Sequence, residues 1–564
     1  MKHDNIRVKP LDFFLYNNNI KSKLTKSWIS SSGLIVVATA PMVATSCSSK
    51  QETLSINCEN GTVVGHKNNG VWEWLGIPFA KPPVGELRWK APQKPDNSSD
   101  IKVCDKFSPA PVQIENYPYK SDKISEDCLY LNVWAADNDI KDRAVMVWIH
   151  GGSFTVGSIS EDMYQGVNFV KAHPEIILVS IEYRLGMYGF IDLSSSVGGE
   201  NFPTAPVNGL LDQALGINWV HDNITNFGGN KDNVTVFGQS SGGISAAIQA
   251  VMPEQYKAPI KKVIAESGNA TLNIDKSYLK PNVDNLISVT HAKNMDDLMS
   301  ISESDLIDIY INKGVGAHLW FPTFDNEVFS VGNAPNDRYL RGEASNIKFM
   351  AGATADESNI WMTETPFFNL EQLKEYATKS FAKSIATIPE DERPAIYDYL
   401  NTCRNHDDEA LAKLELINDL SFKATSVKNV EVQSQYNDSY LYYWDYPSSV
   451  KDIGSPHSAE LIFVFDQPTS QSNLINGTNA DPKVYKIVQD LWSSFAITGI
   501  PKSGDFVWPK YTTSERNTLV IGGPEASGDR STRVEKNWML EQTLKAYPLF
   551  KYVIFFVNYY DLWE

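Results

Sequence analysis

Five short apolar runs, separated by longer polar and helix-like stretches, constrain the fold of this chain more than any other feature of its sequence. They occupy residues 144–149 (AVMVWI), 176–181 (IILVSI), 234–237 (VTVF), 262–265 (KVIA) and 348–351 (KFMA). Each run is largely continuous in its hydrophobicity, which is typical of strands covered on both faces of a mostly parallel sheet. Residues 210–223 carry apolar side chains at helical spacing, as a crossover helix should. The pattern predicts a doubly wound α/β fold.

The rest of the 564-residue chain gives no sign of a second folded unit. Residues 54–548 contain no internal repeat, no long low-complexity run and no Gly/Pro-rich linker. We therefore expect one large domain over residues 54–564. The apolar run at residues 552–557 (YVIFFV) is far shorter than the roughly 20 residues that a membrane-spanning helix needs.

Composition and charge exclude several classes of protein. Hydrophobic residues make up 42% and charged residues 21% of the chain, which excludes a disordered protein and a polytopic membrane protein. Acidic residues outnumber basic ones by 68 to 50, and the formal net charge is -18. Because this charge would repel phosphate backbones, the sequence argues against a nucleic-acid partner.

The first 47 residues have the organisation of an export segment. Lys21, Lys23 and Lys26 precede a mostly apolar stretch at residues 28–43, and small residues then lead to Cys47. The segment resembles the lipobox of bacterial lipoproteins, which makes Cys47 a candidate lipidation site and residues 48–53 a tether. A plain secretory signal or a single uncleaved anchor is the alternative. We expect an exported protein that is secreted, periplasmic or anchored at the cell envelope, with membrane contact only through this segment.

Residues 238–243 (GQSSGG) follow one of the apolar runs directly and precede a helix-like stretch. A tight strand-to-helix turn requires glycines such as Gly238 and Gly242 around the central serine, and it exposes that serine's hydroxyl group. The helix that follows directs its free N–H groups and positive dipole end toward the same place. A phosphate-binding loop or a plain turn is the alternative, but no lysine follows the glycines. Ser240 is therefore the predicted nucleophile.

A second glycine motif, residues 150–153 (HGGS), ends the first apolar run. Loops of this type offer backbone N–H groups to the oxyanion of a tetrahedral intermediate. The predicted donors are Gly152, Ser153 and Ser241, while Gly151 lets the backbone turn. A simple turn between a strand and a helix is the alternative for this motif taken by itself.

Other blocks of the sequence point to a known family. Residues 125–133 (SEDCLYLNV) resemble the second signature of type-B carboxylesterases, and residues 76–85 (GIPFAKPPVG) resemble an N-terminal block of the same family. Three further blocks are similar and occur in family order, at residues 182–186, 208–213 and 219–224. The chain is identified over about residues 54–525 as a member of the carboxylesterase/cholinesterase family. This resemblance implies the α/β-hydrolase fold and serine-dependent hydrolysis of carboxylic esters, with no metal and no cofactor.

The resemblance also implies an acid for the catalytic triad. Family members carry it in a G-x-x-x-D-E-G loop after a strand, and residues 352–358 (GATADES) match this loop, with Ser358 in the place of the last glycine. Glu357 is the predicted acid. Asp356 is its nearest rival, and we expect Asp356 to face solvent instead.

The catalytic base is expected in a block that begins with histidine and ends in apolar residues. Residues 457–465 (HSAELIFVF) fit that family block. In α/β-hydrolases the histidine follows the acid along the chain, and only His406 and His457 do so here. Because His406 lies in a polar, charged run, His457 is the predicted base. It would take the Ser240 proton while Glu357 holds the imidazole tautomer, and an acyl-enzyme would form.

The family resemblance further implies a disulfide between Cys104 and Cys128, which agrees with export to an oxidising compartment. Cys58 and Cys403 have no such partner and are expected to be free thiols.

Substrate class is indicated by what this chain lacks. Cholinesterases carry a tryptophan in the loop between the two cysteines and a glutamate before the nucleophile, whereas this chain has Phe107, Tyr117 and Tyr119 in that loop and Gln239 before Ser240. A quaternary ammonium group would lose its cation–π and charge partners. We therefore expect hydrolysis of small neutral esters, not of choline esters. A catalytically silent interaction protein on the same fold is one alternative, and a lactonase, thioesterase or lipase with the same triad is another.

Overall fold

A mostly parallel sheet forms the centre of the molecule. The computed structural model describes residues 52–114, 121, 123–137, 139–271, 274–361, 369–467, 481–522 and 533–535. In spatial order the strands of the 13-stranded sheet are β1 (Thr53–Cys58), β2 (Gly61–Asn68), β3 (Val71–Pro78), β7 (Tyr130–Ala136), β9 (Ile176–Ile181), β8 (Arg143–Ile149), β10 (Gly229–Gln239), β11 (Lys262–Glu266), β12 (Lys348–Thr354), β13 (Ser439–Asp445), β16 (Thr518–Gly522) and β17 (Arg533–Glu535), with β4 (Ile101–Val103) beside β2. All pairs from β9 to β16 are parallel.

The five predicted strands are confirmed as β8 to β12, and they are neighbours in the parallel part of the sheet. Their side chains alternate between two hydrophobic clusters: Val147 and Ile149 of β8 belong to one, whereas Met146 and Trp148 belong to the other. Both faces are therefore buried, which explains why the strands are continuously apolar.

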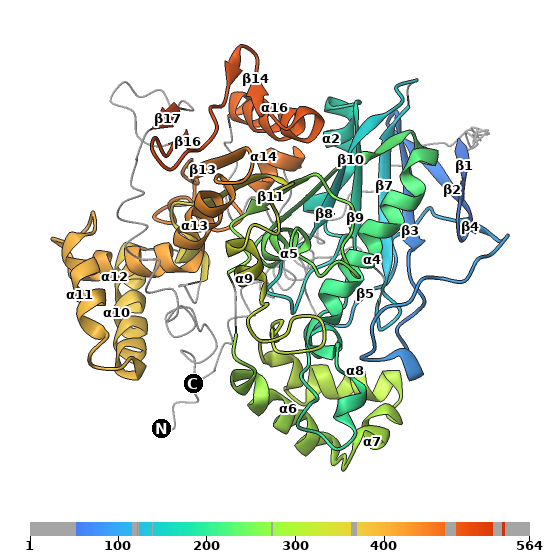
Figure 1. The fold of residues 1–564 in the computed structure, drawn as a ribbon, viewed down its shortest axis with the longest axis horizontal. Coiled ribbons are helices and arrows are strands. Elements are labelled where there is room, and N and C mark those ends of the chain that lie inside the picture. Colours follow the sequence, from blue (N-terminus) through green and yellow to red (C-terminus); the bar gives the residue numbers. More distant parts are fainter. Residues whose placement is uncertain are drawn as a thin grey trace, which may run out of the picture.

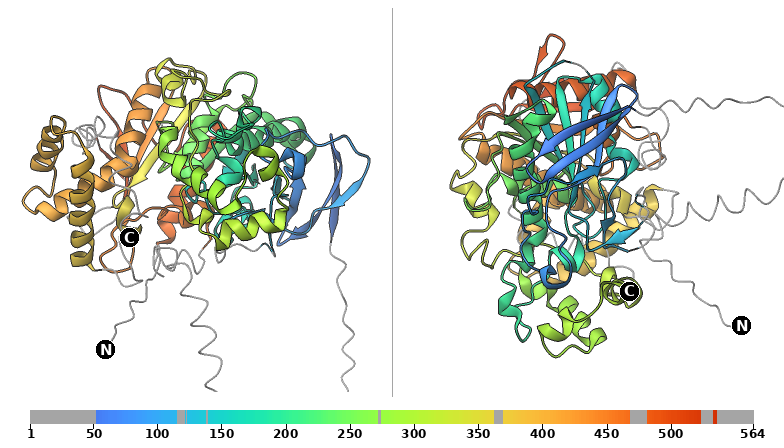
Figure 2. Two further views of the ribbon diagram at one scale, coloured as in Figure 1. Left: turned by 90° about the horizontal axis from the view of Figure 1, so that it is seen from below. Right: turned by 90° about the vertical axis from the view of Figure 1, so that its right-hand side faces the viewer.

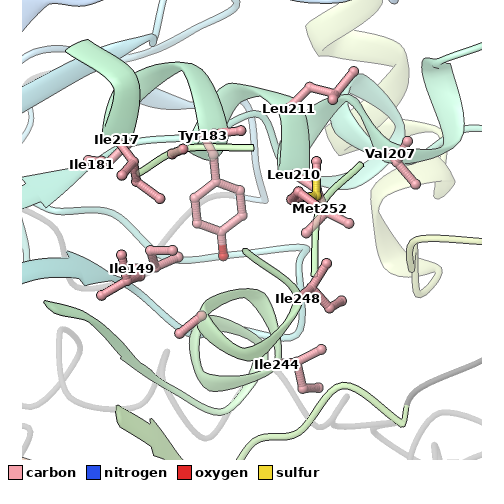
Figure 3. Packing of buried hydrophobic residues seen from close by; sticks show 14 of the residues in the cluster. Ile149, Ile181, Tyr183, Val207, Leu210, Leu211, Ile217, Ile244, Ile248 and Met252 are labelled. Atoms are coloured by element: carbon pink, nitrogen blue, oxygen red, sulfur yellow. The ribbon is translucent and has the colours of Figure 1, made fainter. Parts of the chain in front are cut away.

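Helices cover both faces of the sheet (Figure 1). One face is covered by α4 (Asn208–Asn223), α5 (Ser241–Gln249) and α13 (Ala424–Gln433). The other is covered by α2 (Gly166–Ala172), α14 (Leu461–Phe465) and α16 (Pro482–Thr498). The predicted crossover helix at residues 210–223 is confirmed as α4. Figure 3 shows its apolar side chains meeting those of α5, with the Tyr183 ring between the two helices.

Two groups of helices extend from the sheet. The first comprises α6 (Lys276–Thr290), α7 (Met295–Met299) and α8 (Glu303–Asn312), and the second comprises α10 (Leu370–Thr387), α11 (Arg393–Thr402) and α12 (Glu409–Asn418). The short helix α9 (Pro335–Leu340) packs against α13. The second group has its own apolar cluster and lies at the opposite end of the molecule from β1 and β2 (Figure 2). Shorter elements are α3 (Gly186–Gly189) and the pairs β5 (Ala110–Pro111) with β6 (Ile124–Ser125) and β14 (Lys502–Ser503) with β15 (Phe506–Val507).

The predicted export segment at residues 1–47, most of the tether at residues 48–53 and the apolar run at residues 552–557 lie outside the described residues. Among the helices of the described ranges, none is long and apolar enough to span a bilayer.

A buried ion pair joins the end of β9 to α4. Asp212 accepts hydrogen bonds from the Arg184 backbone N–H (3.0 Å), from Nε (2.8 Å) and from Nη2 (2.7 Å). Both residues are almost inaccessible to solvent, with 2% of Arg184 and 0% of Asp212 exposed. The pair occupies two of the family blocks noted in the sequence, so these blocks hold a helix against the sheet.

Replacing Asp212 with alanine should destabilise the fold strongly, because it leaves a buried guanidinium without its counter-ion. We expect Asp212→Ala to lower the free energy of unfolding by about 3–5 kcal/mol. Asp284→Ala is the matched control, since the Lys280–Asp284 pair is more than half exposed and should be worth less than about 1 kcal/mol. Urea denaturation followed by tryptophan fluorescence measures both, and equal losses would contradict the prediction.

Candidate active site

Ser240 occupies the turn between β10 and α5 in a strained backbone conformation. Its φ is 59° and its ψ is -128°, a region that costs a residue with a side chain about 1–3 kcal/mol. Two hydrogen bonds hold the turn: Ser240 N donates to Glu266 O, and Ile244 N donates to Ser240 O, both at 2.9 Å. Because α5 begins at the next residue, the free N–H groups of its first turn surround the serine.

The glycines beside Ser240 are required by close packing, as the sequence predicted for a turn of this type. A Cβ on Gly242 would lie 2.1 Å from Ile149 O, and one on Gly238 would lie 2.5 Å from the carbonyl carbon of Gly242. A Cβ on Gly151 would lie 3.2 Å from the Ser240 Cβ. The HGGS loop after β8 therefore packs directly against the serine.

Glu357 lies just after β12 and is fully buried. Its Oε2 is 2.5 Å from His457 Nδ1. Its other oxygen, Oε1, accepts hydrogen bonds from Ser267 Oγ (2.6 Å) and Thr354 N (2.8 Å). Ser267 is a site residue that the sequence analysis missed, although its place directly after β11 could have indicated it. These bonds fix the carboxylate so that it can orient the imidazole.

His457 comes from the loop that follows β13. Its ring stacks on Phe422 at 4.8 Å between centroids, and its backbone N donates to Glu357 O at 3.3 Å. Since Nδ1 donates to the glutamate, Nε2 carries the lone pair, and it accepts a hydrogen bond from Gln239 Nε2 at 2.9 Å. The ring thus lies beside the residue that precedes Ser240, with its basic nitrogen toward the turn.

The two rival residues lie elsewhere. Asp356 was expected to face solvent, which is wrong: it is partly buried, and its Oδ2 accepts a hydrogen bond from Ser455 N at 2.9 Å. Burial raises the pKa of this carboxyl. Asp356 thereby holds the loop that carries His457. His406 is half exposed, and its Nδ1 faces Cys403 O at 2.9 Å.

The loop after β8 carries the candidate oxyanion donors. Gly152 and Ser153 both have positive φ, at 106° and 55°. The Gly152 carbonyl accepts hydrogen bonds from Thr155 N (3.0 Å) and Val156 N (2.9 Å). Because a trans peptide is planar, this carbonyl places the Ser153 N–H on the opposite side. Ser241 contributes the first N–H of α5.

The predicted disulfide between Cys104 and Cys128 is wrong, because both are free, buried thiols. Cys104 follows β4, and its backbone is hydrogen-bonded to β2 and β3. Cys128 instead lines a small cavity together with Pro111. Cys58 and Cys403 are also free, as expected.

Within the described ranges, no group of three or more His, Cys, Asp or Glu side chains is arranged to hold a metal ion. The candidate site contains a serine on a strained turn, a histidine and a buried glutamate.

Comparison with known proteins assigns the family. Residues 52–538 match the model of the Carboxylesterase family. The chain belongs to the carboxylesterase family. It is 31% identical to para-nitrobenzyl esterase of Bacillus subtilis over 87% of this chain and 98% of the relative, and 28% identical to acetylcholinesterase of Bungarus fasciatus over 86% and 85%. A solved carboxylesterase of Geobacillus stearothermophilus superposes with a TM-score of 0.74 at 28% identity, covering 87% of this chain and 99% of that one. The α/β-hydrolase fold and carboxylic ester hydrolysis follow.

Two further buried carboxyls lie beside the candidate site of this carboxylesterase. Glu266, the last residue of β11, accepts a hydrogen bond from Trp492 Nε1 at 2.6 Å. Glu460 accepts one from Tyr442 OH at 3.4 Å. Burial raises the pKa of Glu266 to about 8, and burial together with the Glu266 charge raises that of Glu460. Burial thus favours the protonated form of both carboxyls.

This pair should make the enzyme progressively less stable as pH rises from about 4.5 toward 8. A carboxyl whose pKa is higher in the folded than in the unfolded protein stabilises the fold fully at a pH below its unfolded pKa. This contribution is lost as pH rises from the unfolded pKa through the folded pKa. Between about pH 4.5 and pH 8 the free energy of unfolding should fall by up to about 1.4 kcal/mol per pH unit for each proton that the folded state keeps and the unfolded state has lost, and the contribution of Glu266 should level off above pH 8. Glu266→Gln keeps an acceptor for Trp492 and cannot ionise, so its fall should be smaller.

Urea denaturation of the full chain between pH 5 and 9 measures this difference. Glu371→Gln is the control, because Glu371 is exposed and should leave the pH dependence unchanged. A Glu266→Gln profile that runs parallel to that of the wild type would show that Glu266 does not titrate in this range.

Proposed function

We propose that Ser240, His457 and Glu357 are the catalytic triad of this carboxylesterase. The contact between Glu357 Oε2 and His457 Nδ1 at 2.5 Å carries the proposal. It fixes the imidazole tautomer with its lone pair on Nε2, which is the atom that must take the serine proton. The strained turn at Ser240 supports the same assignment, because such strain is maintained where a side chain must project in one direction.

The reaction follows from these positions. Ser240 Oγ attacks the ester carbonyl while His457 Nε2 takes its proton, and the bond to the alcohol breaks as the imidazolium returns that proton to the leaving oxygen. Water then repeats the sequence on the acyl-enzyme. In the free enzyme Gln239 Nε2 donates to the same lone pair. One lone pair accepts one strong hydrogen bond, so this amide must yield when the serine proton is transferred.

The oxyanion formed in each step would be held by the N–H groups of Gly152, Ser153 and Ser241. Their positions on the HGGS loop and at the start of α5 support this role, since both segments pack against Ser240. Fixed N–H groups stabilise the developing negative charge without having to reorganise during the reaction.

The substrates we propose are small neutral carboxylic esters. Gln239 is uncharged in the position before the nucleophile, so the site lacks there the negative charge that a quaternary ammonium substrate would prefer. Lactones, thioesters and lipid esters share the acyl chemistry and remain alternatives. A silent interaction protein is disfavoured, because it would have no need of a histidine–glutamate pair beside a strained serine.

Replacing Ser240 with alanine should abolish hydrolysis of p-nitrophenyl butyrate by the full chain. We expect kcat to fall by at least about 10⁴-fold, and the double variant with His457→Ala to be no worse, because triad members act as a unit. Burst and steady-state release of p-nitrophenol measure this. Ser98→Ala, on the exposed surface, should keep full activity. Turnover that persists in Ser240→Ala would show that Ser240 is not the nucleophile. A wild-type protein that is folded but shows no turnover would favour the catalytically silent interaction protein.

We further propose that residues 1–47 direct export and that Cys47 is lipidated, on the basis of the basic, apolar and small residues before it. Expressed as the full chain in a bacterium, the protein should partition into the detergent phase of Triton X-114, and Cys47→Ser should move it to the aqueous phase. Cys403→Ser serves as the control, because this buried thiol lies within the folded domain. Aqueous partitioning of the wild type would contradict lipidation.

A further inference from the structure

A second histidine–glutamate pair lies behind the candidate oxyanion hole. His150, directly after β8, and Glu182, directly after β9, are both fully buried. His150 Nε2 is 3.3 Å from Glu182 Oε2. On its other side, His150 Nδ1 is 2.8 Å from Gly151 O. The reaction described above does not use either residue.

Hydrogen-bond chemistry determines where the protons of this pair must be. A carbonyl oxygen only accepts, so Nδ1 must carry a proton to bond Gly151 O. Nε2 and Glu182 Oε2 lie 3.3 Å apart and have no other partner among the described residues. Two lone pairs facing each other at this distance would repel, and a second ring proton, on Nε2, removes that repulsion. Glu182 Oε1 already accepts hydrogen bonds from Ser158 Oγ (2.5 Å) and Ile159 N (3.1 Å), so two donors already face this oxygen.

We propose that His150 is an imidazolium ion-paired with Glu182, and that Glu182 acts through it as the positioning residue of the oxyanion hole. This inference rests on the oxyanion hole proposed above. It adds to that proposal the side chains that set the direction of the Gly152 N–H.

The direction follows from the geometry of a single peptide unit. The Gly151 carbonyl and the Gly152 N–H belong to the same planar trans peptide and therefore point in opposite directions. When His150 Nδ1–H holds the carbonyl, it fixes the Gly152 N–H on the other side, away from the imidazole. Glu182 holds the imidazole in turn. The chain of contacts thus runs from a buried carboxylate to one candidate donor N–H.

The surroundings leave the imidazole little freedom to turn. The Tyr183 ring stacks on it at 4.5 Å between centroids, and Tyr183 OH donates to His150 O at 2.9 Å. Burial raises the pKa of Tyr183, so the phenol remains a neutral donor. A Cβ on Gly157 would lie 2.5 Å from His150 Nδ1, so only glycine fits there.

Other charged groups around the pair are already engaged. The buried Glu161 accepts a hydrogen bond from Ser158 N at 3.1 Å. Arg184, two residues after Glu182, is bonded to Asp212. The imidazolium also places a positive charge next to the loop on which the oxyanion develops, and this charge favours the tetrahedral intermediate over the planar ester.

The isosteric variant Glu182→Gln tests the proposal. Its amide oxygen still accepts from Ser158 and Ile159, and its NH₂ group donates to a neutral imidazole, so shape and hydrogen bonds are kept while the charge is lost. We expect kcat for p-nitrophenyl butyrate to fall about tenfold, which is less than the roughly 10²- to 10³-fold loss in kcat when an oxyanion donor is deleted. KM should change less than twofold. The affinity for a trifluoromethyl ketone, whose adduct carries an oxyanion, should fall by the same factor as kcat/KM.

Glu73→Gln is the matched control. It alters another histidine–glutamate pair, that of the partly buried His66 with the buried Glu73 at 3.1 Å, which lies on β2 and β3. Its kcat and its ketone affinity should equal those of the wild type. Equal losses in both variants, or an unchanged kcat and ketone affinity in Glu182→Gln, would overturn the proposal.

The charge on His150 is measured directly by ¹⁵N NMR of the histidine-labelled full chain, with the signal assigned by its loss in His150→Gln. We expect an imidazolium signature at pH 7.5 in the wild type and a neutral imidazole in Glu182→Gln. A neutral His150 in the wild type would overturn the ion pair. A wild type with the imidazolium signature but no esterase activity and no ketone binding would contradict the proposed function while leaving the pair in place.

Discussion

Parallel pairing brings the carboxyl ends of β8 to β13 to one edge of a sheet whose two faces are both buried. Polar groups have no place on those faces, so the chain's chemistry gathers where the strands end. Successive strands end at or shortly before His150, Glu182, Ser240, Glu266 and Glu357, and His457 lies in the loop that follows β13. The site depends on this shared edge, because these residues are up to 307 positions apart in the chain and would not otherwise meet.

The same burial determines how ionisable groups are neutralised. An ionised carboxylate in a dry interior is costly unless a cation or several donors face it. Asp212 meets Arg184, and Glu357 meets His457. The Glu266 carboxyl has only the neutral indole N–H of Trp492 as its hydrogen-bond partner in the described part of the chain. It therefore tends to keep a proton. The carboxyls around Ser240 are thus stabilised in different ways, some by a facing cation or histidine and others by retaining a proton.

Sequence patterns predicted the parts of the structure that depend on local composition. Continuous apolar runs predicted the central strands, because burial on both faces leaves a recognisable signature in one segment. The glycines around Ser240 predicted the turn, since close packing admits no side chain there. The disulfide between Cys104 and Cys128 was wrong, because cysteine pairing depends on where two distant segments are placed. For the same reason, the burial of Asp356 and the contact between Gln239 and His457 were not foreseen.

By itself, the sequence determined the α/β-hydrolase fold, the family and the candidate nucleophile, acid and base, because each is encoded in a short segment with its own spacing and composition. Only the tertiary structure decided which groups face each other at the sheet edge: Ser267 on Glu357, Gln239 on His457 and Glu182 on His150. These contacts join residues from different strands, and their distances depend on the pairing and twist of the whole sheet. The protonation of the buried groups depends on the same contacts, since burial and neighbouring charge set which form is stable.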